Sequence, residues 1–219
     1  MAIKEIFENI FIINSKLATR NLVPGEKVYG ETLLSMNGSE YRLWNPYRSK
    51  LAAAILNGLK EMHIKKGARI LYLGAANGTT CSHVSDIIGK NGLVFCVEIS
   101  ERSMRDLIKV CEKRNNMLPI LADARNFSQY ESDVGNVDII YEDVSSKDQA
   151  EILLANAKML SEKGYAYVAI KSQSIDSSKN PSEVYEEFIK KVSGKFKVKE
   201  RVNLGPFHKK HLFVVFEKR

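Results

Sequence analysis

The chain has 219 residues, a mass of 24.7 kDa and a formal net charge of +7, from 33 Lys and Arg against 26 Asp and Glu. At roughly 100 to 200 residues per domain, this length predicts one full domain with at most a small appendage, which excludes a large multi-domain architecture. Hydrophobic residues make up 44% of the chain, and no apolar run reaches the roughly 18 to 20 residues of a membrane span, so we also exclude disordered, fibrous and membrane-spanning classes.

The N-terminal segment and the cysteines indicate in which cellular compartment the protein is expected. Met1 to Leu22 mixes Lys, Glu, Asn and Arg among its apolar residues, which predicts neither a membrane anchor nor a signal peptide. The three cysteines, Cys81, Cys96 and Cys111, are odd in number and form no CxxC pair, which argues against a disulfide framework and against a zinc site. We therefore expect a reducing, cytoplasmic location and no metal.

Nearly all of the net positive charge lies at the C-terminal end. Lys190 to Arg219 contains ten Lys and Arg and two acids, Glu200 and Glu217, which gives +8 and leaves the rest of the chain near neutral. A basic segment attached to a neutral body indicates a polyanionic partner, most simply a nucleic acid. A solvated, lysine-rich surface is an equally weighted alternative.

The first 45 residues predict a small β-rich domain. Their apolar runs are short and show no helical period, and turn-forming Pro24-Gly25 and Asn37-Gly38 separate them. The runs are Ile10–Ile13, Lys27–Tyr29 and Glu40–Leu43.

Residues 46–219 predict an α/β domain. Asn45-Pro46 is a helix-start signal, and the apolar spacing that follows it predicts a helix from about Pro46 to Met62. Runs typical of buried parallel strands then alternate with amphipathic stretches around Met104–Cys111 and Ala150–Leu160, which predicts a doubly wound sheet. The predicted strands are Arg69–Leu73, Leu93–Glu98, Pro119–Ala122, Val137–Tyr141 and Tyr165–Ile170.

The end of the chain departs from this alternation. After a helix opened by Asn180-Pro181, two strand-like runs follow at Val198–Leu204 and Leu212–Phe216. The connection Gly205–His211 is too short for a crossover helix, so the two strands should pair antiparallel. Five parallel strands with a terminal antiparallel hairpin are typical of the Rossmann-like, class I methyltransferase sheet rather than the dehydrogenase sheet.

A glycine-bearing turn, Gly74 to Thr80, leads from the first predicted strand into a helix, the place where open α/β sheets bind ligands. It has no lysine and is therefore not a P-loop, and Ala76 stands where a GxGxxG loop has the glycine that approaches a pyrophosphate. An adenosine ligand without phosphates fits this turn better. Its candidate contacts are Gly74, Ala75, Thr79 and Thr80.

Acids follow the next three predicted strands. Glu98 is positioned to accept hydrogen bonds from ribose hydroxyls, Asp123-Ala124 could contact an adenine amino group, and Asp143 completes the row. A single acid at a strand end often only caps the next helix. Three in succession beside a glycine turn favour a functional site.

Several segments together resemble the fibrillarin family, in order from about residue 20 to the C-terminus. They are Tyr41–Ile55, Tyr72–Thr80, Ser82–Ile87, Arg114–Asn116 with Pro119–Arg125, Val137–Val144 and Ala169–Asp176. The sequence shows no Gly/Arg-rich N-terminal extension like that of the eukaryotic members, so it is most similar to the archaeal form. For that form the location would be cytoplasmic, and nucleolar only in a eukaryote.

The resemblance implies methylation of ribose 2′-hydroxyls in rRNA and tRNA, with S-adenosylmethionine as the methyl donor. It also implies that the protein acts inside a box C/D guide ribonucleoprotein, where it docks on a Nop-family scaffold protein beside a kink-turn binding protein. The guide RNA of such a particle selects the target nucleotide.

The resemblance further implies four catalytic residues, Lys50, Asp143, Lys171 and His211. A protonated 2′-hydroxyl is a poor nucleophile, so the reaction needs in-line placement and a group that takes or stabilises its proton. On this hypothesis Lys171 accepts the proton or stabilises the alkoxide and Asp143 orients it. Lys50 and His211 would hold the ribose and phosphate.

Three departures from the family pattern lie at or near the expected cofactor site. Ile99 replaces the usual aromatic after Glu98, Val144 is followed by Ser145-Ser146 instead of Ala-Gln, and Gly205 replaces a Glu. Ile99, Val144, Ser145 and Ser146 remain expected cofactor contacts. The departures leave open the alternative of a structural ribonucleoprotein subunit with little catalysis, whereas a nicotinamide dehydrogenase is disfavoured by Ala76 and the antiparallel end.

Other aromatic and histidine residues receive structural interpretations. Trp44, Tyr41 and Tyr47 could stack on RNA bases, but we favour a role in packing the N-terminal domain onto the sheet. His63 is expected at a helix end and His83 on a helix surface.

Overall fold

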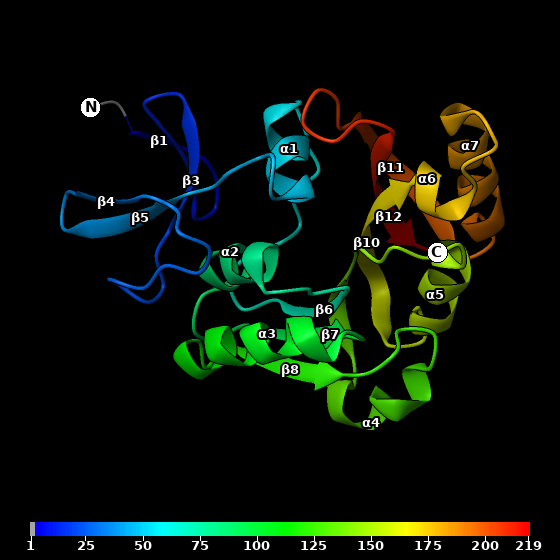
Figure 1. Cartoon of the computed structure of the whole chain (residues 1–219), viewed down its shortest axis with the longest axis horizontal. Coiled ribbons are helices and arrows are strands. Elements are labelled where there is room, and N and C mark those ends of the chain that lie inside the picture. The colour runs from blue at the N-terminus through cyan, green and yellow to red at the C-terminus, as the bar shows by residue number, and fades with distance from the viewer. Residues whose placement is uncertain (1–2) are drawn as a thin grey trace.

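The computed structural model describes residues 3–219 and contains two β-sheets (Figure 1). The N-terminal sheet is antiparallel throughout, in the order β1-β2-β3-β5-β4, and lies beside α2 through β3. Its strands are β1 (Ile3–Phe7), β2 (Ile10–Ile13), β3 (Lys16–Arg20), β4 (Leu33–Met36) and β5 (Ser39–Leu43). A domain boundary after residue 45 stays a prediction.

The larger sheet has seven strands in the order β11-β12-β10-β9-β6-β7-β8. Its first five strands along the chain are parallel, and β12 pairs antiparallel with both β10 and β11, which confirms the predicted methyltransferase-like sheet. The strands are β6 (Arg69–Leu73), β7 (Leu93–Glu98), β8 (Met117–Leu121), β9 (Val137–Glu142), β10 (Leu160–Lys171), β11 (Phe196–Asn203) and β12 (His211–Lys218).

Helices cover both faces of this sheet. One face packs against α1, α2 and α3, and the other against α4, α5 and α7. The helices are α1 (Lys50–Leu56), α2 (Thr79–Ile88), α3 (Glu101–Lys113), α4 (Glu131–Val134), α5 (Gln149–Asn156), α6 (Ser172–Ile175) and α7 (Pro181–Val192), with a 3-10 turn at Phe127–Gln129. No helix within residues 3–219 is long and apolar enough to cross a membrane.

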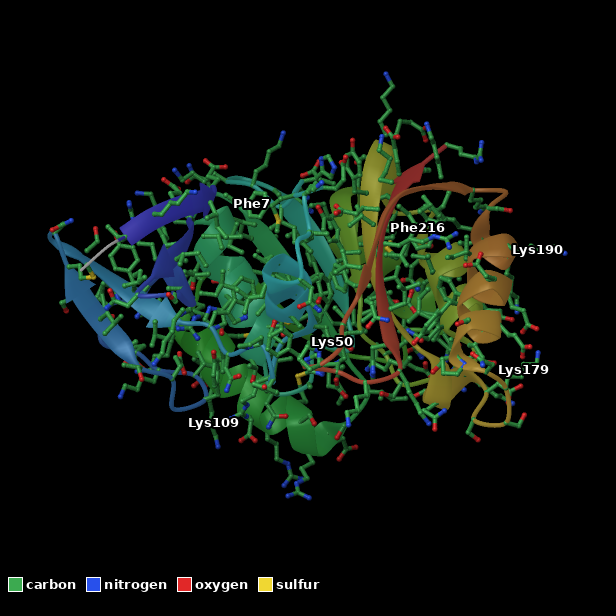
Figure 2. All side chains as sticks on the ribbon, turned by 90° about the horizontal axis from the view of Figure 1, so that it is seen from above. Phe7, Lys50, Lys109, Lys179, Lys190 and Phe216 are labelled. Atoms are coloured by element: carbon green, nitrogen blue, oxygen red, sulfur yellow. The ribbon has the colours of Figure 1, made fainter. Side chains whose placement is uncertain are left out.

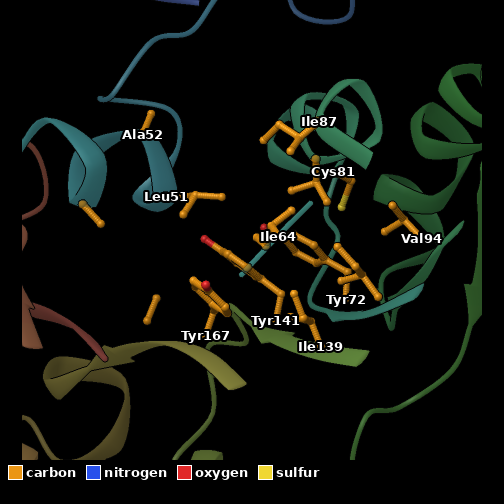
Figure 3. Close-up of a cluster of buried hydrophobic side chains, with 14 of the residues drawn as sticks. Leu51, Ala52, Ile64, Tyr72, Cys81, Ile87, Val94, Ile139, Tyr141 and Tyr167 are labelled. Carbon is orange, nitrogen blue, oxygen red and sulfur yellow. The ribbon is translucent and has the colours of Figure 1, made fainter. Parts of the chain in front are cut away.

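The two faces have separate apolar cores because side chains alternate along each strand. Tyr72, Tyr141 and Tyr167 point to the face of α1 and α2, where Figure 3 shows them between Leu51 and the sheet. The rings of Tyr72 and Tyr141 stack at 4.4 Å. This packing fixes α1 over the carboxyl ends of the central strands.

A buried charge network joins the N-terminal sheet to the larger one. Asp86 on α2 binds the Arg42 guanidinium of β5 at 2.9 Å and that of Arg114 at 2.7 Å, and Arg42 also binds Glu31. All four side chains are almost fully buried. Each charge therefore depends on its partners for the stabilisation that water would otherwise supply.

The structure corrects several expectations about single elements. Lys27–Tyr29 is not a strand, because the backbone N–H groups of Val28 and Tyr29 bind the Glu31 carboxylate in a loop. The helix predicted over Pro46–Met62 is shorter, because only α1 (Lys50–Leu56) is helical. Asn45-Pro46 opens a turn before it, and Ser49 caps its start. Gly58, with φ +97°, follows its end.

Two histidine interpretations are wrong for related reasons. His63 lies beyond the shortened α1, where its ring stacks on Tyr165. His83 is fully buried, because the N-terminal sheet covers the outer side of α2, and it hydrogen-bonds Thr19 and Tyr29. Trp44 stacks on His83, as expected of a packing residue.

Candidate active site

A cavity of about 490 Å³ opens at the carboxyl ends of the parallel strands, between β6, β7, β8 and β9. Sixteen residues line it, drawn from the ends of β7 and β10, the loop after each of β6, β7, β8 and β9, the start of α1 and one residue of α5. They are Lys50, Gly74, Ala76, Val97, Glu98, Ile99, Ala122, Asp123, Ala124, Arg125, Asp143, Val144, Ser145, Ser146, Ile152 and Lys171. Most of the residues predicted from sequence therefore surround one space.

The glycine turn supplies one wall of the cavity. Gly74 adopts φ +83°, and a Cβ there would lie 2.9 Å from the carbonyl oxygen of Asp143, so only glycine lets the two loops approach this closely. Ala76 is also in the left-handed region, with φ +47°, and its N–H donates to Glu98 Oε2 at 2.8 Å. This hydrogen bond connects the glycine turn to the end of β7.

The carboxylates at the ends of β7 and β8 differ in how many hydrogen bonds they already accept from the protein. Glu98 is nearly buried and accepts the N–H groups of Ala76 and Ser100, one on each oxygen, which leaves further lone pairs for hydroxyl donors. Asp123 is bound by the Arg125 guanidinium at 2.6 Å, and these hydrogen bonds lower the pKa of its carboxyl. Both carboxylates face the cavity as acceptors.

Three charged side chains meet at the other end of the cavity. Asp143 follows β9, Lys171 ends the neighbouring strand β10, and Lys50 begins α1 above them. The Asp143 Oδ1 lies 2.9 Å from Lys50 Nζ and 2.8 Å from Lys171 Nζ. Lys171 Nζ also donates to the carbonyl oxygen of Asp143 at 2.7 Å and to Ser145 Oγ at 3.1 Å.

The pKa values of Asp143 and Lys171 are both lowered, for different reasons. Burial alone would raise the pKa of Asp143, but the two ammonium groups outweigh it and lower the pKa, so Asp143 stays ionised at neutral pH. Burial lowers the pKa of Lys171, and Lys50 lowers it further, while Asp143 opposes both. A lysine of lowered pKa is closer to releasing its proton at neutral pH, as a general base requires.

Two neighbouring contacts position Lys171. Its backbone N–H donates to the buried Gln149 Oε1 at 3.0 Å, and its register partner on β12 is His211. The Nδ1–H of His211 donates to the carbonyl oxygen of Lys209, 2.8 Å away, which leaves Nε2 as the unprotonated nitrogen of a neutral ring. Sequence reasoning missed Gln149, whose only signal is a polar residue inside an apolar helix pattern.

Some predicted contacts lie outside the cavity. Ala75, Thr79 and Thr80 do not line it: Thr80 is buried and donates to Ser49 Oγ, and Thr79 faces a separate hollow beside α3. The left-handed Gly74 and Gly78 turn these side chains away from the strand ends. His211 borders Lys171 without lining the cavity.

The departures from the family pattern leave the cavity intact. Ile99 is 60% exposed at its rim, and Ser145 contributes a hydroxyl to Lys171. Ser146 accepts the N–H of Asp148, and the Gly205 carbonyl accepts from Asn57. None of these substitutions removes a contact that holds the glycine turn or the three charges.

The donors and charges of the cavity fit a nucleoside that carries a positive charge and no phosphates. Glu98 offers acceptors for a ribose diol, and the cation at this end of the cavity, Arg125, is bound to Asp123 rather than open to a pyrophosphate. S-adenosylmethionine has this chemistry. Glu98, Asp123 and the glycine turn would hold its adenosine, and Asp143 would face its charged end.

Comparisons with known proteins agree with S-adenosylmethionine as the cofactor. The sequence model of the Fibrillarin family matches residues 1–219. A protein of Pyrococcus abyssi named fibrillarin-like rRNA/tRNA 2′-O-methyltransferase is 49% identical over 219 residues, covering 97% of this chain and 96% of that protein.

Two solved structures are also similar over nearly the whole chain. Aeropyrum pernix fibrillarin, solved with natively bound S-adenosyl-L-methionine, has a TM-score of 0.91 at 45% identity and covers 99% of this chain and 98% of its own. A fibrillarin from a fibrillarin/Nop5p complex has a TM-score of 0.90 at 38% identity and covers 99% of this chain and 100% of its own.

Proposed function

The chain belongs to the fibrillarin family, and from this premise we propose that it methylates ribose 2′-hydroxyls of rRNA and tRNA at sites chosen by a box C/D guide RNA. It is an S-adenosylmethionine-dependent methyltransferase with a class I sheet. S-adenosylmethionine supplies a methyl group that its sulfonium charge already activates, so the protein's task is to place and deprotonate the hydroxyl.

The observation that carries this proposal is the meeting of Asp143 with two lysines at the end of the cavity. Lys171 is the residue that accepts the hydroxyl proton or stabilises the alkoxide, because burial and Lys50 lower its pKa. Asp143 orients the Lys171 ammonium through two oxygens, one from its side chain and one from its backbone. Lys50 and His211 hold the ribose and its phosphate from the α1 side.

The partners follow from the same family membership. We propose docking on a Nop-family scaffold protein, supported by the fibrillarin/Nop5p complex, whose fibrillarin has a TM-score of 0.90 against this chain. The box C/D guide RNA and the kink-turn binding protein would reach this chain through that scaffold. A cytoplasmic location also stays a proposal.

The position of the methyl group tests the reaction. A target RNA is incubated with S-adenosylmethionine and the assembled particle and is then cleaved by alkali, which requires a free 2′-hydroxyl at each nucleotide. We expect one missing band in the ladder, at the guided nucleotide. A complete ladder after incubation with an assembled particle would contradict the proposal.

A calorimetric titration with S-adenosylhomocysteine separates this proposal from a purely structural role. The intact cavity predicts binding by the isolated chain. Absence of binding would favour the structural subunit and would make Ile99 and Ser145 the first residues to restore to the family pattern.

A further inference from the structure

Strand β10 continues past the end of its parallel neighbour β9. The register of the two strands ends with Val168 opposite Glu142, whereas β10 runs on to Lys171. The chain that follows β9 enters the loop that carries Asp143 and leads to α5. The backbone groups of β10 beyond this pairing therefore need other hydrogen-bond partners on the side of β9.

The side-chain amide of Gln149, the first residue of α5, supplies these partners. Its Nε2 donates to the carbonyl oxygen of Ala169 at 3.2 Å, and its Oε1 accepts the N–H of Lys171 at 3.0 Å. These two backbone groups flank Ile170, and one residue of a parallel neighbouring strand would bind the same two. Gln149 is fully buried, so water does not compete for either bond. The amide thus replaces the strand residue that β9 lacks opposite Ile170.

Glu142 has a buried carboxyl group without a hydrogen-bond partner. It is the last residue of β9, and within residues 3–219 neither of its carboxyl oxygens takes part in a hydrogen bond. Burial raises the pKa of Glu142 well above its usual range; the adjacent Gln149 amide and the Lys171 ammonium lower it by less, and Asp143 raises it further. Tyr130, a further titratable neighbour, is uncharged because burial raises the pKa of its phenol. Glu142 is therefore a neutral acid at neutral pH.

Glu142 and Lys171 lie on opposite faces of the sheet. Glu142 points to the same face as Ile140, which α5 covers, whereas the Lys171 ammonium lies with that of Lys50 near α1. Figure 1 shows α1 and α5 on opposite sides of β10, and Figure 2 shows Lys50 beside α1, in cyan. No hydrogen bond joins Glu142 to Lys171 in the described chain. Gln149 is the residue that interacts with both.

The remaining hydrogen-bonding groups of Gln149 and Glu142 are complementary. The bonds to β10 use one Nε2 hydrogen and one Oε1 lone pair of Gln149, which leaves one of each. A neutral carboxyl offers an acceptor oxygen and an O–H donor, which match them. An ionised carboxylate has only acceptors, and its charge would be costly in this buried position. The uncharged form of Glu142 is therefore the form that suits the amide.

We propose that Gln149 and Glu142 are positioning residues for methyl transfer. The Gln149 amide continues the sheet past the end of β9 and fixes the backbone of Lys171, and the Glu142 carboxyl holds that amide. A displacement of about 1 Å at a reacting group can cost about 10² in rate, so a strand end without partners would be a poor support for a proton acceptor. The inference rests on the proposed function, in which Lys171 takes the hydroxyl proton.

The first test is Gln149→Met in the reconstituted particle, a variant of similar length that lacks the amide. We expect the transfer rate at saturating RNA and cofactor to fall roughly tenfold to hundredfold, because Lys171 is displaced, while the KM for RNA stays near wild type. Binding of S-adenosylhomocysteine should not change, which also shows that the variant is folded. An unchanged transfer rate would overturn the proposal.

The matched control is Asn116→Leu. Asn116 is a buried amide that binds two backbone carbonyl oxygens, those of Ser85 and Gly89, and it precedes β8 at the end opposite the cavity. We expect this variant to lose stability in denaturant unfolding without the fall in transfer rate. An equal fall in rate would show a general effect of lost stability and would overturn the proposal.

The carboxyl group is tested with Glu142→Gln and Glu142→Leu. Gln keeps one acceptor and a donor and carries no charge, so we expect the wild-type rate and an unchanged dependence of the rate on pH. Leu removes both groups, and the rate should fall about two- to tenfold. Glu142→Leu/Gln149→Met should be no slower than Gln149→Met, because both changes act through one amide.

The pH profile of Glu142→Gln decides whether the carboxyl acts by charge instead. If wild-type Glu142 were ionised, its loss would lower the pKa of Lys171 and move the rise of the rate to lower pH. Such a displacement would overturn the assignment of Glu142 as a neutral positioning residue.

Hydrogen exchange of the Lys171 amide tests the same contact without a reaction. In Gln149→Met this N–H loses its acceptor, so its exchange should become faster relative to the rest of β10, and in Asn116→Leu it should not. Unchanged relative protection in Gln149→Met would overturn the proposal. If the wild-type particle transfers no methyl group, the proposed function fails, and the exchange measurement still decides whether Gln149 fixes Lys171.

Discussion

Lys171 Nζ lies 2.8 Å from the side-chain oxygen Oδ1 of Asp143 and 2.7 Å from the carbonyl oxygen of the same residue. Lys171 ends β10 and Asp143 directly follows β9, the parallel neighbour of β10, so the sheet itself sets their separation. The Asp143 carboxylate thus stabilises the Lys171 ammonium, whose burial away from water would otherwise be unfavourable. The same carboxylate also holds Lys50 from the opposite side.

Replacing Lys171 by Ala removes the group assigned to the hydroxyl proton. We expect the transfer rate at saturating cofactor and RNA to fall by about 10² to 10⁴, the usual contribution of general base catalysis. Cofactor affinity measured by calorimetry should stay within about threefold, since Glu98 and the glycine turn remain. The matched control is Lys147→Ala, an exposed lysine near the cavity without an ion pair in the described chain. Turnover retained in Lys171→Ala would remove this residue from the mechanism.

The pH dependence of transfer follows from the lowered pKa of Lys171. The free amine is the active form, so the single-turnover rate should rise with pH and level off below pH ~10.4, the ordinary pKa of lysine. Lys50 is one of the causes of the lowered pKa, so the residual activity of Lys50→Ala should rise at higher pH than that of wild type. A rate that is independent of pH in both proteins would argue against proton transfer to Lys171.

A Cβ at Gly74 tests the close approach of the glycine turn to Asp143. Gly67 is a matched control: it has φ +79° and open space around it, whereas Gly74 has φ +83° and backbone at 2.9 Å. We expect Gly67→Ala to cost about 1 kcal/mol of unfolding free energy, the conformational term alone. Gly74→Ala should cost more and also slow transfer, because it displaces Asp143. Equal behaviour of both variants in denaturant unfolding and in transfer would contradict this account.

The buried network around Asp86 predicts a large stability effect far from the cavity. Asp86→Ala leaves the Arg42 and Arg114 guanidinium groups buried without their shared carboxylate, and we expect a loss of about 3 to 5 kcal/mol in denaturant unfolding. The control Glu187→Ala breaks an exposed pair with Lys179 and should cost no more than about 1 kcal/mol. A loss below 1 kcal/mol for Asp86→Ala would show that the network is not needed for folding.

Much of the fold could be predicted because strands buried on both faces leave uninterrupted apolar runs. Arg69–Leu73 and Leu93–Glu98 were predicted with the bounds that the structure shows. Asn180 caps α7 as predicted, since Asn followed by Pro carries a local signal. The same signal at Asn45-Pro46 opens a turn instead, because the chain must first pass from β5 to α1.

The parts of the site that sequence reasoning missed depend on contacts between distant segments. Nothing local to Gln149 indicates that its amide holds the backbone of Lys171, and nothing local to His208 indicates its bond to Pro46. His83 was assigned to a surface because one helix alone does not show that a second sheet will cover it. The acids Glu98, Asp123 and Asp143 could be predicted as one group from the sequence, because parallel strands bring their carboxyl ends to the same edge of a sheet.

The central claim is that the reacting atom is a ribose 2′-hydroxyl, and the most direct measurement is transfer of a tritiated methyl group from S-adenosylmethionine to a short target RNA. The particle is assembled with guide RNA, scaffold and kink-turn proteins. A normal target is compared with one that carries a single 2′-deoxy at the guided position. We expect incorporation into the normal target and none into the deoxy target. Equal incorporation into both, or none into either by a fully assembled particle, would contradict the account.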